Sequence, residues 1–71
     1  MILKVRLNEI LKERDMTQKE LAELSGLRAN TISEITKNIR ESVNRTHLGK
    51  IAKALEIKDP SELLYFEEEK Q

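Results

Sequence analysis

The side chains that are best placed for specific chemistry lie on one predicted helix, residues 29–37, where polar residues recur at helical spacing. At about 100° per residue, the spacing i, i+3, i+4, i+7 places on one face Asn30, Ser33, Glu34 and Lys37. Short polar side chains on an exposed helix can reach base edges in the DNA major groove, and Asn can bond bidentately to adenine. The same stripe is typical of any amphipathic surface helix, so the neighbouring segments must decide between these interpretations.

Residue types that support catalysis or metal binding are scarce. The 71 residues include one His, His47, and no Cys, so a disulfide scaffold is excluded and one imidazole cannot form a zinc site alone. There is no Ser/His/Asp set in a recognisable context and no glycine-rich phosphate loop. We therefore predict a protein that is not an enzyme, with no catalytic residue, no bound metal and no cofactor.

The segment before this helix has the features of a second helix that crosses it steeply. Thr17 and Glu20 fit a capping box, in which each side chain bonds to the other residue's backbone N–H. Ala22 permits a close helix contact, and Gly26 is free to adopt positive φ in the turn. Leu21 and Leu24 give this second helix an apolar stripe. The core shared by the two helices is expected to contain Leu21, Leu27, Ile32 and Ile35. This pattern predicts a helix-turn-helix over about residues 17–37.

Three further helices are expected around this pair. Apolar spacing within 7–14 predicts a first helix. Asn44 is placed to cap a fourth helix that ends near Leu55. Asp59 followed by Pro60 predicts the start of a short fifth helix. The fold class expected is all-α, with five helices.

The two ends of the chain follow a different pattern. Apolar and basic residues alternate over 1–7, and 64–66 contains both aromatic residues of the chain. We expect these segments to pair as a small two-stranded ribbon, with 67–71 as a frayed tail. The whole chain, 1–71, is then one domain in which 1–6 and 63–71 are accessory segments.

Charge is divided unevenly along the chain. The totals of 13 basic and 13 acidic residues cancel, yet residues 1–50 carry a formal charge of +3 and residues 51–71 carry −3. Neutrality therefore does not exclude a nucleic-acid partner, and it predicts limited non-specific affinity. No apolar run approaches the roughly 18 residues that a membrane span requires, and a cytoplasmic protein is expected.

Two blocks of the sequence together resemble the phage repressor/Cro (Xre-like) family of helix-turn-helix regulators. The first block is TQKELAELSGLRANTISEI, from Thr17 to Ile35, and the second is HLGKIAKAL, from His47 to Leu55. They stand in the family's order, and the similarity covers about residues 7–64. The resemblance implies a compact five-helix fold that acts as a homodimer on a palindromic operator in double-stranded DNA, and we expect a repressor of transcription.

The resemblance also implies roles for individual residues. Positions that face bases are Ala29, Asn30 and Glu34, to which the polar stripe adds Ser33. Positions on the phosphate side are Gln18, Arg28, Thr31, Lys37, Asn38, Arg40 and Arg45. Several positions depart from the family pattern. Arg28 stands where Ser or Thr commonly caps the helix, Ser25 stands where an apolar residue often packs, and Asn38 with Ile39 replaces a frequent Gly.

A second hypothesis uses the same fold to bind a protein, as an antitoxin-like or co-regulator subunit. Its support is Glu34 on the outer helix face, the −3 charge of residues 51–71 and the apolar segment 63–66. A positive rim around helix 29–37 would favour DNA, and a neutral or negative rim would favour a protein partner.

Overall fold

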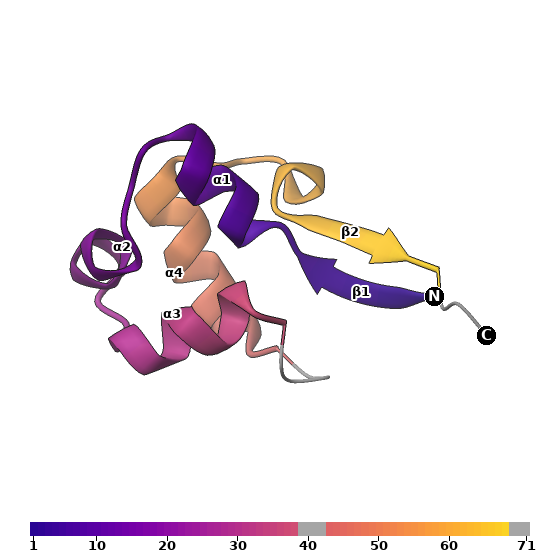
Figure 1. The fold of residues 1–71 in the computed structure, drawn as a ribbon, viewed down its shortest axis with the longest axis horizontal. Coiled ribbons are helices and arrows are strands. Elements are labelled where there is room, and N and C mark those ends of the chain that lie inside the picture. The colour runs from indigo at the N-terminus through magenta and orange to yellow at the C-terminus, as the bar shows by residue number, and fades with distance from the viewer. Residues whose placement is uncertain (39–42, 69–71) are drawn as a thin grey trace.

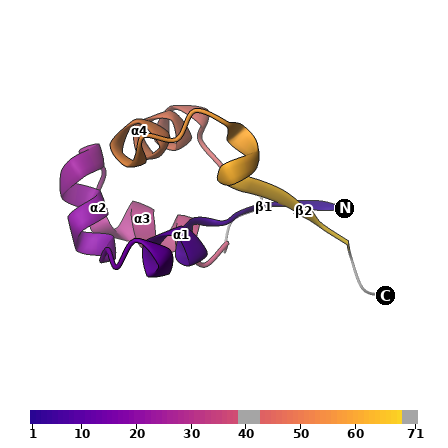
Figure 2. The ribbon, with the colours of Figure 1, turned by 90° about the horizontal axis from the view of Figure 1, so that it is seen from above.

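The computed structural model describes residues 1–38 and 43–68. Its elements are, in chain order, β1 (Ile2–Val5), α1 (Leu7–Glu13), α2 (Gln18–Ser25), α3 (Ala29–Thr36), α4 (Arg45–Leu55), a 3₁₀ turn (Pro60–Glu62) and β2 (Leu64–Glu67). The helices form one body, and the two strands project from it as a ribbon (Figure 1). In the perpendicular view the ribbon again lies to one side of the helices (Figure 2).

One apolar cluster joins the four helices to the root of the ribbon. Its fully buried side chains come from every helix: Leu7, Leu21, Ile32, Ile51 and Leu55. The rest of the cluster is Val5, Ile10, Leu11, Ile35, Ile57 and Leu63. Because full burial of one such side chain stabilises a fold by about 1.5–3 kcal/mol, this cluster sets the helix positions. Val5 and Leu63 belong to it, although both lie at the inner ends of the terminal segments.

The sequence-based prediction was wrong for Leu24, which is 61% exposed. Helix α2 packs against both α3 and α4, and it does so through Leu21, Ala22 and Ser25, which are buried or half-buried. These three positions share one side of a helix with 3.6 residues per turn, and Leu24 lies about a quarter turn away from that side. The contact therefore follows the small residues Ala22 and Ser25 rather than the apolar spacing of Leu21 and Leu24.

The expected fifth α-helix is also a correction. Over residues 1–38 and 43–68 the structure contains four α-helices, and the fifth segment is the single 3₁₀ turn Pro60–Glu62. Asp59 caps this turn as expected, with Oδ1 accepting from the N–H and the hydroxyl of Ser61, each at 2.9 Å. These two hydrogen bonds lower the pKa of Asp59. Leu63 donates its N–H to the Pro60 carbonyl at 3.1 Å as the last hydrogen bond of the 3₁₀ turn, and the chain then enters β2.

The terminal ribbon was predicted correctly. Strands β1 and β2 pair antiparallel, with Val5 opposite Leu64 and Leu3 opposite Phe66. Glu67, expected in the frayed tail, instead ends β2 opposite Ile2, and residues 69–71 of that expected tail lie outside the described residues.

The outer face of the ribbon carries polar contacts between the strands. Lys4 Nζ lies 2.7 Å from Glu67 Oε2, and this hydrogen-bonded carboxylate raises the pKa of Lys4. The Arg6 guanidinium lies 5.0 Å from the centroid of the Tyr65 ring, within the range of a cation–π contact. These exposed contacts order the ribbon and contribute little to the stability of the whole fold.

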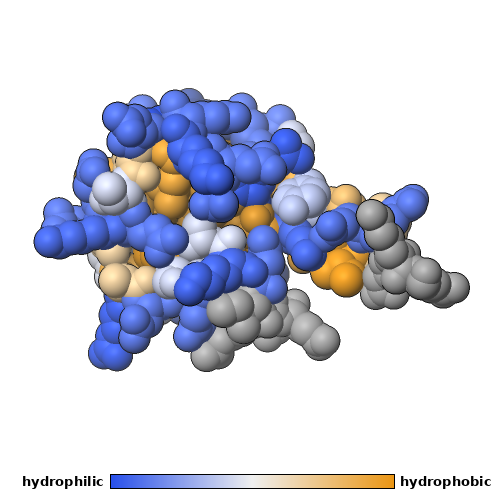
Figure 3. All heavy atoms as spheres, viewed as in Figure 1, coloured by the Kyte–Doolittle hydropathy of each residue, from blue (hydrophilic) through white to orange (hydrophobic). Residues whose placement is uncertain are grey.

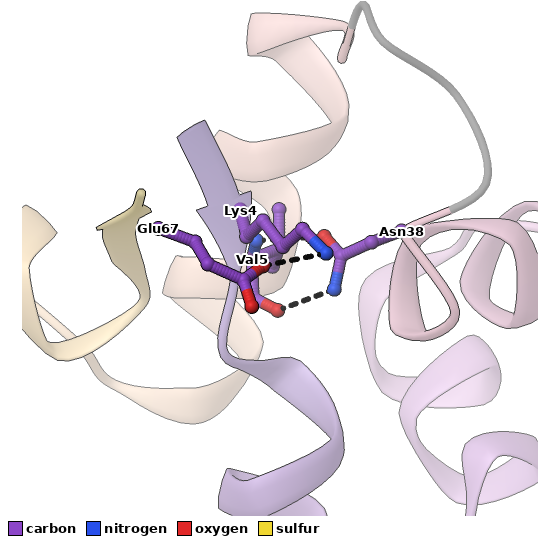
Figure 4. Close-up of polar contacts among 4 residues, drawn as sticks. All are labelled: Lys4, Val5, Asn38 and Glu67. Carbon is purple, nitrogen blue, oxygen red and sulfur yellow. Dashed lines mark hydrogen bonds and ion pairs between the residues drawn. The ribbon is translucent and has the colours of Figure 1, made fainter. Parts of the chain in front are cut away.

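Asn38 joins the end of α3 to the ribbon. Its backbone has φ of 53°, in the left-handed region. Its side-chain Oδ1 accepts from the Val5 N–H at 2.8 Å, and its Nδ2 donates to the Val5 carbonyl at 3.1 Å (Figure 4). The amide thus bonds to Val5 as a neighbouring strand would. This connection fixes the ribbon against the C-terminal end of α3.

A second long-range hydrogen bond joins the C-terminal ends of α1 and α4. Arg14 Nη1 donates to the Leu55 carbonyl at 2.6 Å. That carbonyl belongs to the last turn of α4, where carbonyl groups lack helical partners and a positive charge is favourable. Arg14 therefore ties the end of α1 to the end of α4.

We predict that two substitutions of Asn38 separate the contribution of its side-chain hydrogen bonds from that of its left-handed backbone. Asn38→Gly keeps the left-handed backbone accessible but removes both bonds to Val5, and we expect a loss of about 1–3 kcal/mol in the free energy of unfolding. Asn38→Ala also adds left-handed strain, roughly 1–2 kcal/mol more. Urea denaturation measures both variants, and an Asn38→Gly variant as stable as the wild type would contradict the connection.

We also predict that Glu56→Gly raises stability. Glu56 ends α4 with φ of 57° and is exposed, a conformation that costs a non-glycine residue roughly 1 kcal/mol. The matched control is Lys53→Gly, an exposed position inside the same helix, where glycine is expected to cost about 1 kcal/mol. Thermal unfolding should show the two midpoints moving in opposite directions; a lower midpoint for Glu56→Gly would contradict the strain.

Candidate nucleic-acid interface

The start of α2 is fixed by the capping box that the sequence predicted. Glu20 donates its backbone N–H to Thr17 Oγ1 at 3.1 Å, and Glu20 Oε1 accepts from the Thr17 backbone N–H at 3.4 Å. Gln18 is the first residue of α2 and is half-buried. Its side chain therefore leaves the helix from a defined first turn.

The turn between α2 and α3 is short and hydrogen-bonded. Gly26 ends α2 with φ of 77° and donates its N–H to the Ala22 carbonyl at 3.0 Å. The Ser25 hydroxyl accepts from the Leu27 N–H at 3.2 Å. Gly26 confirms the prediction of a positive φ at this position. Only three residues separate the two helices, so their crossing is tightly constrained.

The rotation of α3 about its own axis is set by its buried side. Ile32, Ile35 and Thr36 are buried, and the Thr36 hydroxyl donates to the Ile32 carbonyl, so this buried polar group is satisfied within the helix. The opposite side of α3 is left for solvent or a ligand. The sequence analysis did not single out Thr36, since a threonine hydroxyl that bonds back into its own helix leaves no periodic signal.

The structure places the predicted contact residues in three groups. Those with exposed side chains are Arg28, Ala29, Asn30, Lys37 and Arg45. Those that are half-buried are Gln18, Thr31, Ser33, Glu34 and Asn38. Arg40 lies outside the described residues. Of the polar stripe that the helical spacing predicted, Asn30 and Lys37 at its two ends are exposed, whereas Ser33 and Glu34 between them are half-buried.

Exposed cations lie at both ends of α3. Arg28 immediately precedes α3, and Lys37 immediately follows its last residue. Arg45 is the first residue of α4. Positive side chains at these places are the kind of residue expected beside the phosphates of a duplex, whereas Glu34 on the same helix is acidic.

Arg28 leaves the first turn of α3 without a side-chain cap. Its backbone is extended, with φ of −73° and ψ of 148°, as at an ordinary N-cap, yet its side chain makes no capping hydrogen bond. Arg28, which stands where Ser or Thr commonly caps the helix, therefore does not replace that cap. The N–H groups of this turn and the positive end of the helix dipole favour an anion at the start of α3.

Asn38 differs from the other predicted phosphate contacts. Both polar atoms of its side chain are bonded to Val5, and its backbone N–H donates to the Ile35 carbonyl at 3.1 Å. We therefore assign Asn38 to positioning α3. Its Nδ2 carries a second N–H, so the phosphate contact expected of it stays a prediction. A neighbouring family position is often Gly, and the shared requirement for positive φ is the signal that sequence analysis had available.

A hollow of about 460 Å³ lies beside α3, where α3 and the start of α4 come together. Thr31 and Glu34 line it, together with Asn44 and His47 of the α4 start. Asn44 caps α4 as predicted, with Oδ1 accepting from the N–H groups of Thr46 at 2.8 Å and His47 at 3.3 Å. The hollow brings His47 to the flank of α3, a proximity that helical periodicity does not encode.

The described part of the chain has neither a candidate metal site nor a membrane-spanning helix. Residues 1–38 and 43–68 contain no group of three or more His, Asp or Glu side chains arranged to hold a metal ion. None of the described helices is long and apolar enough to cross a membrane.

Comparison with known proteins gives one match. A sequence model of a protein family, described as a Cro/C1-type HTH DNA-binding domain, matches residues 6–69. No curated protein and no solved structure matches the chain.

We predict that Arg28→Ser stabilises the fold. A serine hydroxyl at this extended position can accept from a free N–H of the first turn of α3, and a new N-cap is worth roughly 0.5–2 kcal/mol. Arg28→Ala is the matched control, because it removes the same charge without adding a cap. Urea denaturation should rank the serine variant above both alanine and wild type, and equal stability of the serine and alanine variants would contradict the absence of a cap.

Proposed function

Because the chain belongs to the family of Cro/C1-type HTH DNA-binding domains, we propose that it is a sequence-specific transcriptional regulator that inserts α3 into the DNA major groove. The observation that carries the proposal is the polar outer side of α3, which Ile32 and Ile35 hold at a fixed rotation. The major groove, about 12 Å wide, admits one helix and displays a distinct pattern of donors and acceptors for each base pair.

Base recognition is proposed for the outer residues of α3. The exposed Asn30 amide can accept from and donate to one adenine, a bidentate pairing. Ala29 offers a methyl group to thymine, and Ser33 offers a hydroxyl. Glu34 can accept from a cytosine amino group, and it reaches the groove from the flank of α3, since it is half-buried.

Backbone recognition is proposed for the residues that surround this stripe. Arg28 and Lys37 would bind phosphates at opposite ends of α3, and Arg45 would bind from the start of α4. Gln18 and Thr31, both half-buried, would add neutral hydrogen bonds from the helix starts. For Arg40, which lies outside the described residues, we propose the phosphate contact that the family resemblance implies. Such contacts set the register of a protein on DNA and leave sequence choice to α3.

We further propose that the regulator is a homodimer that acts as a repressor on a palindromic operator. A single helix reads only one half-site, and two half-sites one helical turn apart match a protein with two-fold symmetry. A dimer bound over an operator excludes other proteins from the same DNA by steric overlap. The exposed cations Arg28, Lys37 and Arg45 support DNA binding over the alternative, a module that binds only protein.

Selection of bound sequences from a random duplex pool tests the proposal most directly. The expected product is a two-fold symmetric site with at least one strongly preferred A·T pair in each half. If the folded protein enriches no sequence at about 50 mM salt, where phosphate contacts are strong, the DNA-reading role of α3 is wrong.

We predict that Asn30→Ala and Lys37→Ala weaken binding in different ways. Loss of the Asn30 amide should cost about 1–3 kcal/mol on the selected site and relax the choice at one A·T pair. Loss of Lys37 should weaken binding to all duplexes and reduce the slope of log K against log salt by about 0.9. Gel shifts over a salt series on the selected site and on a scrambled duplex measure both effects.

Lys53→Ala is the matched control for these measurements. Lys53 is an exposed lysine in the last turn of α4, the turn that Arg14 contacts, whereas the start of α4 is the part that lies beside α3. The substitution should leave both the affinity and the salt slope unchanged. An equal effect of Lys53→Ala and Lys37→Ala would mean that binding follows total charge and not the position of α3.

A further inference from the structure

The hydrogen-bond pattern of the ribbon shows which backbone groups face outward. In an antiparallel pair, opposite residues alternate between those that bond each other and those whose N–H and C=O point away. Val5 bonds to Asn38, on the side away from β2, and Arg6 donates to Leu63 across the ribbon. Therefore the pairs Val5–Leu64 and Leu3–Phe66 turn their backbone groups outward, toward the two edges of the sheet.

The two edges of the ribbon are not equivalent. On the β1 edge, Asn38 occupies both outward groups of Val5. On the β2 edge, the outward groups of Leu64 and Phe66 have no hydrogen-bond partner among the described residues. A row of unpaired N–H and C=O groups on an edge strand is a template for pairing with another strand. Among the described residues, the β2 edge therefore offers both Leu64 and Phe66, with their outward N–H and C=O groups, for pairing with another strand.

One face of the ribbon is apolar and extends beyond the core. Leu3 and Phe66 lie directly opposite each other and are 50% and 64% exposed. They share their face with Val5 and Leu64, since alternate residues of a strand point the same way. Apolar surface is visible on the ribbon beside the helical body (Figure 3).

We propose that β2 is the dimer interface of this regulator, pairing antiparallel with β2 of a second copy across a two-fold axis at Tyr65. The two ribbons then form one four-stranded antiparallel sheet, in the strand order β1–β2–β2–β1. In this register Leu64 of each copy lies opposite Phe66 of the other, and both pairs bond through their outward groups. This inference deepens the proposed function, on which its DNA measurements rest.

The occupant is a second copy because β2 is complementary to itself in this register. On one face of the four-stranded sheet, the side chains that lie side by side across the strands are all apolar. Leu3 and Phe66 of one copy are followed there by Leu64 and Val5 of the other. Glu67 is on the opposite face, where it is paired with Lys4 of its own chain, and in this register it does not meet its own copy. The paired residues 64–66 carry no charge. Continued outward, the same register sets Glu68 of each copy opposite Glu62 of the other, a like-charge pair that weakens the dimer.

The size of the ribbon sets the expected strength. Strands of four residues cover much less than the roughly 800 Å² per partner of a standard stable interface. We therefore expect a dimer with a dissociation constant in the micromolar range or weaker. Two half-sites on one duplex would hold the two copies together by effective concentration, so the ribbon would serve mainly to make operator binding cooperative.

The test uses proline at two positions that are matched across the ribbon. Phe66→Pro removes an outward N–H on the β2 edge and leaves the bonds between β1 and β2 intact, because those involve the neighbouring residues. Leu3→Pro removes an outward N–H and an exposed apolar side chain in the same way, but on the β1 edge. Circular dichroism and thermal unfolding check that both variants keep the fold.

Sedimentation equilibrium from about 1 μM to 1 mM, the range that spans a weak interface, measures the dimer. Phe66→Pro should raise the dissociation constant at least about tenfold, since it removes both hydrogen bonds and apolar contact, whereas Leu3→Pro should change it less than about threefold. Equal effects of the two variants, or a wild type that stays monomeric throughout, would overturn the β2 interface. A monomeric wild type would leave this edge for a strand of a different protein.

Hydrogen exchange gives a readout without substitution. The amides of Leu64 and Phe66 should become protected as the protein concentration rises, and the amide of Leu3 should not. Protection that is independent of concentration, or that appears first at Leu3, contradicts the proposed edge.

Binding to DNA then separates this inference from the proposed function. Phe66→Pro should bind an isolated half-site as the wild type does but lose cooperative binding to the full palindrome. If neither protein binds any duplex, the proposed function fails while the sedimentation result still decides the dimer. If the wild type binds both half-sites independently, the ribbon interface is wrong and α3 remains the reading helix.

Discussion

The arrangement of this small protein depends on one shared apolar cluster that takes a fully buried side chain from every helix. Leu21 of α2, Ile32 of α3 and Ile51 of α4 have no solvent exposure. Because these residues occupy one side of each helix, burying them also decides which side of each helix remains outside. The polar face of α3 is therefore a consequence of core packing, and the proposed base contacts depend on it.

Hydrogen bonds between distant residues then fix what the apolar cluster leaves free. Arg14 ties the α1 end to the end of α4, and Asn38 ties the end of α3 to β1. The second of these has two consequences. It holds the proposed reading helix against the ribbon, and it occupies part of the β1 edge, which leaves β2 as the edge open to pairing. The side chain of Asn38 thus connects the helix proposed to read DNA with the proposed dimer surface.

Local signals predicted much of this structure correctly. The capping box at Thr17, the positive φ of Gly26 and the caps at Asn44 and Asp59 all formed as expected, because each involves residues within one turn of each other. Predictions that needed the surroundings were less accurate. Leu24 followed a helical spacing yet is exposed, since α2 packs on its small residues, and the expected fifth helix is a 3₁₀ turn, after which the chain enters β2.

By itself, the sequence determined the helix-turn-helix, the polar stripe from Asn30 to Lys37 and the tendency of the chain ends to form strands. These features are encoded by residue type and by spacing over a few residues, so they can be recognised without knowledge of the tertiary contacts. The partner of Asn38, the approach of His47 to α3 and the difference between the two ribbon edges were decided only by the tertiary structure. Each depends on the relative positions of segments far apart in the chain, and those positions follow from packing the whole core at once.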